Sequence, residues 1–284
     1  MYRSKVDARL GLAVTSAGVL SSVIVGMILL FLIKESWPLL SSVGVMRFLT
    51  DASWHPLQML YGKTPMLVGT LLTSVLATLI AAPLGIGSAL FCRYLAAPSF
   101  ARVQRALVAL LAGIPSVVYG FWGLVVLVPL IAAVAPPGAS VLAASIVLAI
   151  MILPTIALTT DAALGAIPAS YEQGAVALGL SREATMIEVV LPAAKSGIVA
   201  GILLAFARAL GETMAVLMVA GNVVQIPTSV FDPVRTLTAN IALEMAYATG
   251  AHRQSLFVSG LALTLLVGVI VVVAWLRTER RAYV

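Results

Sequence analysis

Four segments of this sequence run for more than 20 residues without a single Asp, Glu, Lys or Arg. They are residues 10–33, 64–92, 106–160 and 254–276, which contain 24, 29, 55 and 23 residues. A helix needs about 20 apolar residues to cross a bilayer, so each segment is long enough and the third could hold two helices. In lipid every backbone N–H and C=O must be paired within the protein, and these runs lack the alternation of barrel strands. The sequence therefore predicts an all-α membrane protein.

The composition agrees with a chain whose solvent is mostly lipid. Of the 284 residues 61% are hydrophobic and 10% are charged, whereas a soluble domain normally has about 25% charged residues. One Cys and two His cannot form a metal cluster. The sequence also contains no P-loop, no Ser/His/Asp arrangement and no nucleic-acid-binding pattern. We therefore expect a non-catalytic protein that binds no metal, cofactor or nucleic acid.

About six transmembrane helices are expected in one domain that covers residues 1–284. The segment 135–138, Ala-Pro-Pro-Gly, supplies the turn between two spans, and a fifth span covers about 196–220. Eleven of the seventeen Lys and Arg residues lie on one side of these spans, five lie on the other side, and Arg208 lies within a span. Cytoplasmic loops carry an excess of positive residues. The sequence therefore predicts an inner-membrane protein with both termini and residues 161–195 in the cytoplasm, and residues 34–64 and 221–253 in the periplasm.

The cytoplasmic loop 161–195 is longer than a plain connection requires. Its capping signals predict two short helices that would form a rigid docking element, and the alternative is a solvated hairpin that only joins two spans. The signals are a capping box of Ser170 and Gln173, a left-handed glycine at Gly179, a cap at Ser181 and a terminating proline at Pro192.

The same loop resembles the EAA loop of ABC importer permeases, which has the pattern E-A-A-x3-G-x9-I-x-L-P. The chain departs from this pattern where Gln173 replaces the glutamate and Val189 replaces the isoleucine. The resemblance implies that the loop inserts into a cleft on an ATPase subunit and couples ATP hydrolysis to gating. The residues that carry this coupling role are Gln173, Gly174, Ala175, Gly179, Leu191 and Pro192.

Arg208 and Glu212 are charged residues within the fifth expected span. An Arg at the centre of a membrane helix costs at least about 2.5 kcal/mol, so it must face a bundle interior or an aqueous cavity. Residues i and i+4 share one helix face, so the two side chains could form an ion pair that helps helices to pack. The alternative is functional, because a guanidinium binds tetrahedral oxyanions through two parallel hydrogen bonds.

Two segments resemble the phosphate-specific transport permeases, a family of ABC importer subunits. One segment is residues 113–120, Gly-Ile-Pro-Ser-Val-Val-Tyr-Gly, and the other is residues 208–216, whose end Glu-Thr-Met-Ala-Val is similar to the C-type of two homologous permeases. The resemblance covers about residues 65–270 and implies that Arg208 and Glu212 are required for transport. Ile114, Pro115 and Ser116 have two interpretations of equal weight, a kinked helix with close packing or a gate.

The resulting hypothesis is an ABC type I importer permease fold that forms half of a phosphate pathway and works by alternating access. The resemblance implies four partners: a second, A-type permease, a dimer of ATP-binding subunits that uses the ATP, a periplasmic phosphate-binding protein and the lipid bilayer. One alternative is a permease for another oxyanion such as sulfate or molybdate. A second alternative is an ion-coupled secondary transporter, which internal inverted repeats would favour.

Overall fold

The computed structural model describes residues 5–279, which are almost entirely helical. The first part of the chain forms α1 (Lys5–Val43), α2 (Val45–Thr50), β1 (Trp54–His55), η1 (Pro56–Gln58), β2 (Leu60–Tyr61), α3 (Thr64–Leu90), η2 (Phe91–Leu95), α4 (Pro98–Gly113), α5 (Ser116–Trp122), η3 (Gly123–Leu127) and α6 (Val128–Ala132). The second part forms α7 (Val141–Gly165), α8 (Ala169–Ala177), α9 (Arg182–Ala184), η4 (Thr185–Val190), α10 (Leu191–Leu210), α11 (Met214–Val219), α12 (Leu237–Glu244) and α13 (Gly250–Glu279). Of the segments labelled η, η1 is a 3-10 turn and the others are π-helical.

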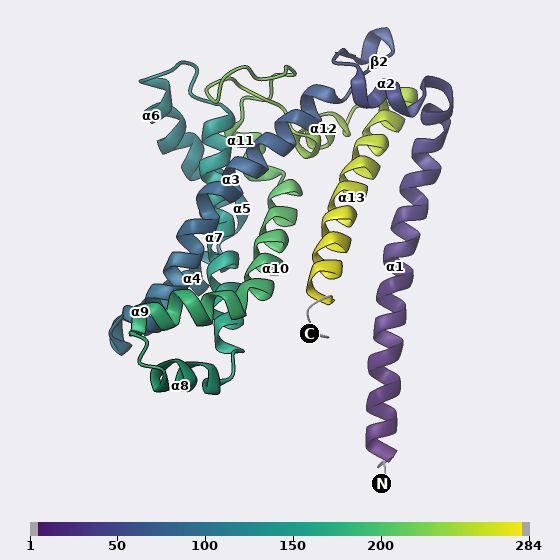
Figure 1. The fold of residues 1–284 in the computed structure, drawn as a ribbon. Coiled ribbons are helices and arrows are strands. Elements are labelled where there is room, and N and C mark those ends of the chain that lie inside the picture. Colours follow the sequence, from purple (N-terminus) through teal and green to yellow (C-terminus); the bar gives the residue numbers. More distant parts are fainter. Residues whose placement is uncertain (1–4, 280–284) are drawn as a thin grey trace.

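Helices α3, α7 and α10 form the centre of the bundle (Figure 1). Helix α7 is the most buried of them, and its Leu148, Met151 and Ile152 have almost no exposed surface. Glycines on α3 and α10 let these helices approach α7 closely: a Cβ on Gly85 would lie 2.9 Å from the Ile156 side chain. Small residues at contacts allow membrane helices to gain dispersion energy without a hydrophobic driving force between them.

Helices α1 and α13 lie side by side at the edge of the bundle (Figure 1), with Phe31 and Phe257 in edge-to-face contact at 5.5 Å between ring centroids. Nearly all of the apolar side chains described on α1 are exposed. An apolar surface of this extent is unstable in water but suits lipid. This explains why a helix so long packs mainly against one neighbour.

Five helical segments are long and apolar enough to cross a membrane, and α4 with the helices from Ser116 to Ala132 makes a sixth if this pair, bent by 95°, counts as one span. The prediction of about six transmembrane helices agrees with this number. The expected turn at 135–138 also lies outside the helices. The expected first span was too short, because α1 continues past Lys34 to Val43.

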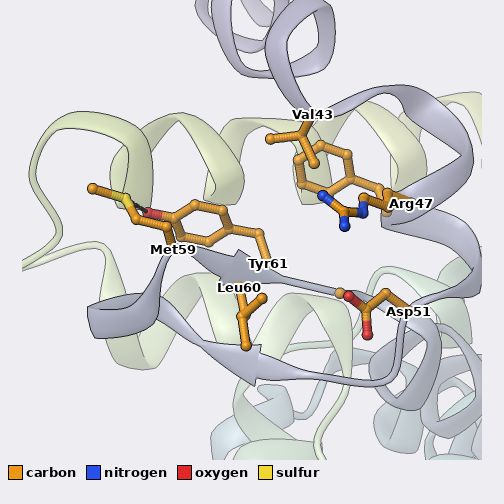
Figure 2. A pocket seen from close by; sticks show the side chains of 8 residues that line it. Val43, Arg47, Asp51, Met59, Leu60 and Tyr61 are labelled. Atoms are coloured by element: carbon orange, nitrogen blue, oxygen red, sulfur yellow. Dashed lines mark hydrogen bonds between the residues drawn. The ribbon is translucent and has the colours of Figure 1, made fainter.

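The two ends of the bundle differ. One end carries α8 and is called the α8 end here; the other, the hairpin end, carries the strands β1 and β2 together with α2 and α12 (Figure 1). Figure 2 shows a small pocket at the hairpin end, with Tyr61 and Met59 facing Arg47 and Asp51 across it. Its volume of about 20 Å³ holds about one water molecule, so it is too small for a substrate. The extreme termini, residues 1–4 and 280–284, lie outside the described residues, and the side of the membrane on which each end lies stays a prediction.

Candidate functional site

The expected fifth span, residues 196–220, is not one helix. The helix that contains Arg208 begins at Arg182 as α9, continues through the π-helical η4 and ends with α10 at Leu210. Residues 211–213 are non-helical, and α11 then begins at Met214. The expectation was wrong because hydropathy does not change at this break, whereas the backbone does.

Glu212 lies in this break and caps the short helix that follows. Its carboxylate Oε1 accepts a hydrogen bond from the Ala215 backbone N–H at 3.2 Å. Its backbone carbonyl accepts a hydrogen bond from the Thr238 hydroxyl at 2.7 Å. A carboxylate stabilises the free N–H groups at the start of a helix. Glu212 therefore has a structural role at α11 whether or not it meets a substrate.

Arg208 lies in the last turn of α10 and has an exposed side chain. Its Nη1 donates a long hydrogen bond of 3.4 Å to Oγ1 of Thr155 on α7. Arg208 and Glu212 are both described, and no ion pair joins them. The ion pair, one of the two alternatives for these residues, does not form, because α10 ends between them and the i, i+4 relation of a continuous helix is lost. The Arg208 guanidinium therefore lacks a carboxylate partner among the residues whose side chains are described, 10–48 and 50–273.

A second break separates α4 from α5. Ile114 and Pro115 both have extended backbone conformations, and the chain turns there by 95°. The Tyr119 hydroxyl donates a 2.7 Å hydrogen bond to the Leu111 carbonyl, across the bend. Proline lacks the N–H that would continue the helix and restricts the residue before it, which explains the break. The structure has a bend at Ile114, Pro115 and Ser116, as the kinked-helix interpretation expects. The gating role of these residues stays a prediction.

The structure brings the two breaks together, because α5 packs against α11. A Cβ on Gly120 would lie 2.8 Å from the Cα of Ala215, so only glycine permits this contact without a shift. The Arg208 guanidinium also lies close enough to the buried Tyr119 to interact with it electrostatically. Tyr119 was missed by sequence reasoning, although it stands within the motif 113–120. The two motifs therefore lie next to each other in the bundle and form one candidate site.

The loop 161–195 contains the expected short helix α8, but two details of its capping signals differ from the prediction. The helix begins at Ala169 after Pro168, and no side chain caps it, so the capping box of Ser170 and Gln173 was wrong. Pro168 itself occupies the N-cap position, two residues before the serine expected there, and a proline loses no helical hydrogen bond at this position because the first N–H groups of a helix have no partner within it. Pro192 also fails to end the second helix, which continues as α10. The π-helical turn η4 stands directly before Leu191 and Pro192, and its altered hydrogen-bond pattern accommodates a residue that has no N–H.

The other two capping signals are confirmed. Gly179 has a φ of +78°. The Leu180 N–H donates to the Ala175 carbonyl and the Gly179 N–H donates to the Val176 carbonyl, which is the Schellman pattern. The Ser181 hydroxyl accepts a hydrogen bond from the Ala184 N–H at 3.1 Å and caps the second helix.

Most of α8 is open to solvent. Among the predicted coupling residues Gln173, Gly174 and Gly179 are exposed, Ala175 is buried, Leu191 is half-buried and Pro192 is exposed. Three large side chains of the same loop are also exposed, with fractions of 51% for Tyr171, 69% for Val176 and 84% for Leu178. Large apolar side chains that are left exposed in one short segment are consistent with a protein interface there.

The hairpin end contains a cluster of charges that sequence reasoning missed. Oε1 of Glu244 on α12 accepts hydrogen bonds from Arg235 Nη1 at 2.6 Å and from Trp54 Nε1 at 3.2 Å, and its Oε2 lies 2.7 Å from Nε2 of His252. Lys63 is buried nearby, with Nζ 3.4 Å from the centroid of the Trp54 ring. These residues are scattered through the sequence, so no local pattern could have revealed the cluster. It joins the starts of α3 and α13 to α12 and the hairpin.

No group of three or more His, Cys, Asp or Glu side chains that could hold a metal ion occurs among the residues searched, 5–279. Cys92 is buried.

Comparison with protein families gives one match that covers most of the chain. Residues 81–281 match the model of the binding-protein-dependent transport system inner membrane component. Three relatives are similar along most of their own length. Phosphate transport system permease protein PstC of Mesorhizobium japonicum is 37% identical, with 94% of this chain and 88% of that protein covered. The probable ABC transporter permease protein YqgH of Bacillus subtilis is 42% identical, with 79% and 75% covered. PstC of Pasteurella multocida is 37% identical, with 88% and 84% covered.

Among solved structures, a chain of the MetNI methionine ABC transporter in an inward-facing conformation is similar with a TM-score of 0.59. The identity is 19%, and the match covers 80% of this chain and 99% of that chain. This likeness shows a common fold and carries no information on the substrate. It agrees with the predicted ABC type I importer permease fold.

Proposed function

This chain belongs to the family of binding-protein-dependent transport system inner membrane components, and we propose that it forms half of the translocation pathway of an ATP-driven importer of inorganic phosphate. It is a multi-pass inner-membrane permease subunit of an ABC transporter, not an enzyme, and it works with partner permease and ATPase subunits. Phosphate is the substrate named for the relatives from Mesorhizobium japonicum and Pasteurella multocida.

One observation carries the choice of an oxyanion: Arg208 is exposed, has no carboxylate partner among the described residues and lies within a membrane bundle. A guanidinium in lipid would be very costly, so this surface faces water or a second subunit. Most of its five N–H donors are available, and a planar fork of donors matches two oxygens of a tetrahedral oxyanion. In this proposal Arg208 contacts phosphate between this permease and a homologous, A-type permease.

The two helix breaks suit alternating access. Membrane proteins tolerate non-helical backbone only where protein or an aqueous cavity surrounds it, and broken helices commonly line transport paths. Ile114, Pro115 and Ser116 form one break and pack next to the other, which holds Glu212. In this proposal the segments α5 and α11 move together as the gate, while α7 stays fixed as the support of Arg208 through Thr155.

The two ends of the bundle would bind different partners. The α8 end, with the exposed side chains of Tyr171, Val176 and Leu178, is proposed to dock on one of two ATP-binding subunits, which bind and hydrolyse the ATP. The hairpin end is proposed to receive a periplasmic phosphate-binding protein.

The test is uptake of labelled phosphate into proteoliposomes that contain the complete transporter and its binding protein. The wild-type complex should import phosphate only with ATP. Arg208→Ala should assemble normally but reduce uptake roughly 100-fold, because two charge-assisted hydrogen bonds to the substrate are lost. Arg208→Lys should recover part of this loss, since an ammonium keeps the charge but lacks the fork.

Arg102→Ala is the matched control, because Arg102 is an exposed arginine whose recorded hydrogen bond is to a backbone carbonyl of its own helix. Adding Glu212→Gln to Arg208→Ala should not restore uptake, since the two side chains are not paired. Wild-type uptake by Arg208→Ala would refute the binding role. Import of sulfate or molybdate in place of phosphate would refute the choice of substrate while leaving the role of Arg208 standing.

A further inference from the structure

Helix α8 needs a mechanical connection to the membrane bundle if it transmits force. The helix packs against η4, the turn that opens the next helix of the same loop. Ala175 is its buried residue, while most of its other side chains are open to solvent. Packing of this small extent gives little rigidity, because few buried contacts hold the segment.

A buried tyrosine supplies a direct link from α8 to the bundle. The Tyr94 hydroxyl donates a 2.9 Å hydrogen bond to Oε1 of Glu172, which lies in the first turn of α8. Tyr94 belongs to η2, the π-helical turn that ends α3. Its ring is 8% exposed and belongs to an apolar cluster with Leu164 at the end of α7 and Val190 before α10. The hydroxyl is therefore held in place by three transmembrane elements.

The turn η2 is itself fixed by charges. Arg93, the neighbour of Tyr94, lies 3.8 Å from Asp161 on α7, and Arg105 on α4 approaches the same carboxylate at 3.4 Å. One carboxylate between two guanidiniums joins α4, α7 and the end of α3. A displacement of α8 that is carried by Glu172 therefore acts on a braced part of the bundle and not on a free side chain.

We propose that Tyr94 is a positioning residue for coupling: its hydrogen bond to Glu172 fixes the angle of α8 relative to α3 and thereby carries movement of α8 into the transmembrane helices. This inference rests on the proposed role of α8 in docking the ATPase. The hydrogen bond depends on both distance and angle, so it restricts rotation of α8 as well as movement of α8 away from η2. The pathway would run from Glu172 through Tyr94 into α3, and along α3 across the membrane.

The experiment uses the assembled transporter in proteoliposomes and measures phosphate uptake, ATPase activity and hydrogen exchange of the α8 amides. Tyr94→Phe removes the hydroxyl and keeps the buried ring. We expect phosphate transported per ATP hydrolysed to fall roughly tenfold and α8 exchange to accelerate by a similar factor, because a hydrogen bond to a carboxylate is lost. ATP hydrolysis should continue, since Tyr94 lies outside the nucleotide sites.

Conservative variants separate positioning from a general structural role. Glu172→Gln keeps an oxygen that accepts from Tyr94 and should couple almost as the wild type does, whereas Glu172→Ala should resemble Tyr94→Phe. The double variant Tyr94→Phe with Glu172→Ala should be no worse than either single variant. Ser22→Ala is the control for the loss of a hydroxyl, because Ser22 is exposed on α1, far from α8 in the sequence, and its hydroxyl donates to the Gly18 carbonyl of its own helix.

Wild-type coupling and unchanged α8 exchange in Tyr94→Phe would overturn the proposal. So would a loss in Glu172→Gln as large as in Glu172→Ala, because the charge and not the link would then matter. A wild-type complex that imports no phosphate would refute the proposed substrate instead. The exchange measurement needs no substrate, so it still tests the link in that case.

Discussion

Lys63 and Arg208 are both basic side chains of a membrane protein, yet they have opposite environments. Arg208 is exposed in the last turn of α10, whereas Lys63 is 3% exposed and its Nζ has no hydrogen-bond partner among the described residues. Burial lowers the pKa of Lys63 well below its ordinary value, the Glu244 carboxylate raises it and Arg235 lowers it further. The sequence places Lys63 at the end of an expected span and Arg208 within another. That Lys63 lacks a hydrogen-bond partner and Arg208 lacks a carboxylate partner depends on tertiary contacts, which no local sequence pattern encodes.

The burial of Lys63 predicts a measurable effect on stability. Lys63→Met keeps an unbranched apolar side chain in this buried position and removes the cationic group, so thermal unfolding in detergent at pH 7 should show a stabilisation of roughly 1–2 kcal/mol. The folded state holds this proton less tightly than the unfolded state, whose lysine pKa is about 10.4. Wild-type stability should therefore rise with pH towards that value, and the difference between wild type and Lys63→Met should shrink.

Lys34→Met is the control for this prediction, because Lys34 is an exposed lysine on α1. It should leave both the stability and its pH dependence almost unchanged. A Lys63→Met variant that is less stable than wild type at every pH would show that the Glu244 interaction outweighs burial.

At the scale of elements, the sequence predicted where long helices exist better than where they break. Gly179 and Ser181 worked as signals because a left-handed backbone and a side-chain cap are local requirements. Pro192 did not end the helix as predicted, because the π-helical turn before it tolerates a residue without an N–H. The break after Leu210 was missed because a residue distant in the sequence supplies one of its hydrogen bonds. Such breaks depend on partners such as Thr238 that are distant in the sequence.

Gly179 permits a test of the loop geometry that is free of steric effects within the chain. No atom lies within 4 Å of a Cβ built at Gly179, so a substitution acts through its φ of +78° alone. Gly179→Val should distort the turn after α8 and reduce coupled transport roughly tenfold, since a β-branched residue tolerates this conformation poorly. Gly179→Asn should retain most activity, because asparagine visits the left-handed region more readily. Equal transport by the two variants would mean that the turn geometry is unimportant.

At the scale of the whole molecule, α3 connects the two ends of the bundle. It begins directly after Lys63, next to the cluster of charges around Glu244. It leads into η2, where the Tyr94 hydroxyl donates a hydrogen bond to Glu172 of α8. It also packs along α7 and α10, so a shift of α3 changes the contacts of both central helices. The sequence predicted the membrane span that contains α3. It gave no signal for the hydrogen bond between Tyr94 and Glu172, which are 78 positions apart.

The orientation of the molecule is the remaining prediction, and the structure supplies better probe positions than the sequence alone. Leu57 in the hairpin is 101% exposed and Val176 on α8 is 69% exposed, and the two lie at opposite ends of the bundle (Figure 1). Cysteine at either position, in a Cys92→Ala background, should react with a thiol reagent once it reaches that side. From the excess of positive residues we expect an impermeant reagent added to intact cells to label Leu57→Cys and not Val176→Cys. Permeabilised cells should show labelling of both, which controls for reactivity. Labelling of Val176→Cys from outside would invert the topology and place α8 out of reach of any cytoplasmic ATPase.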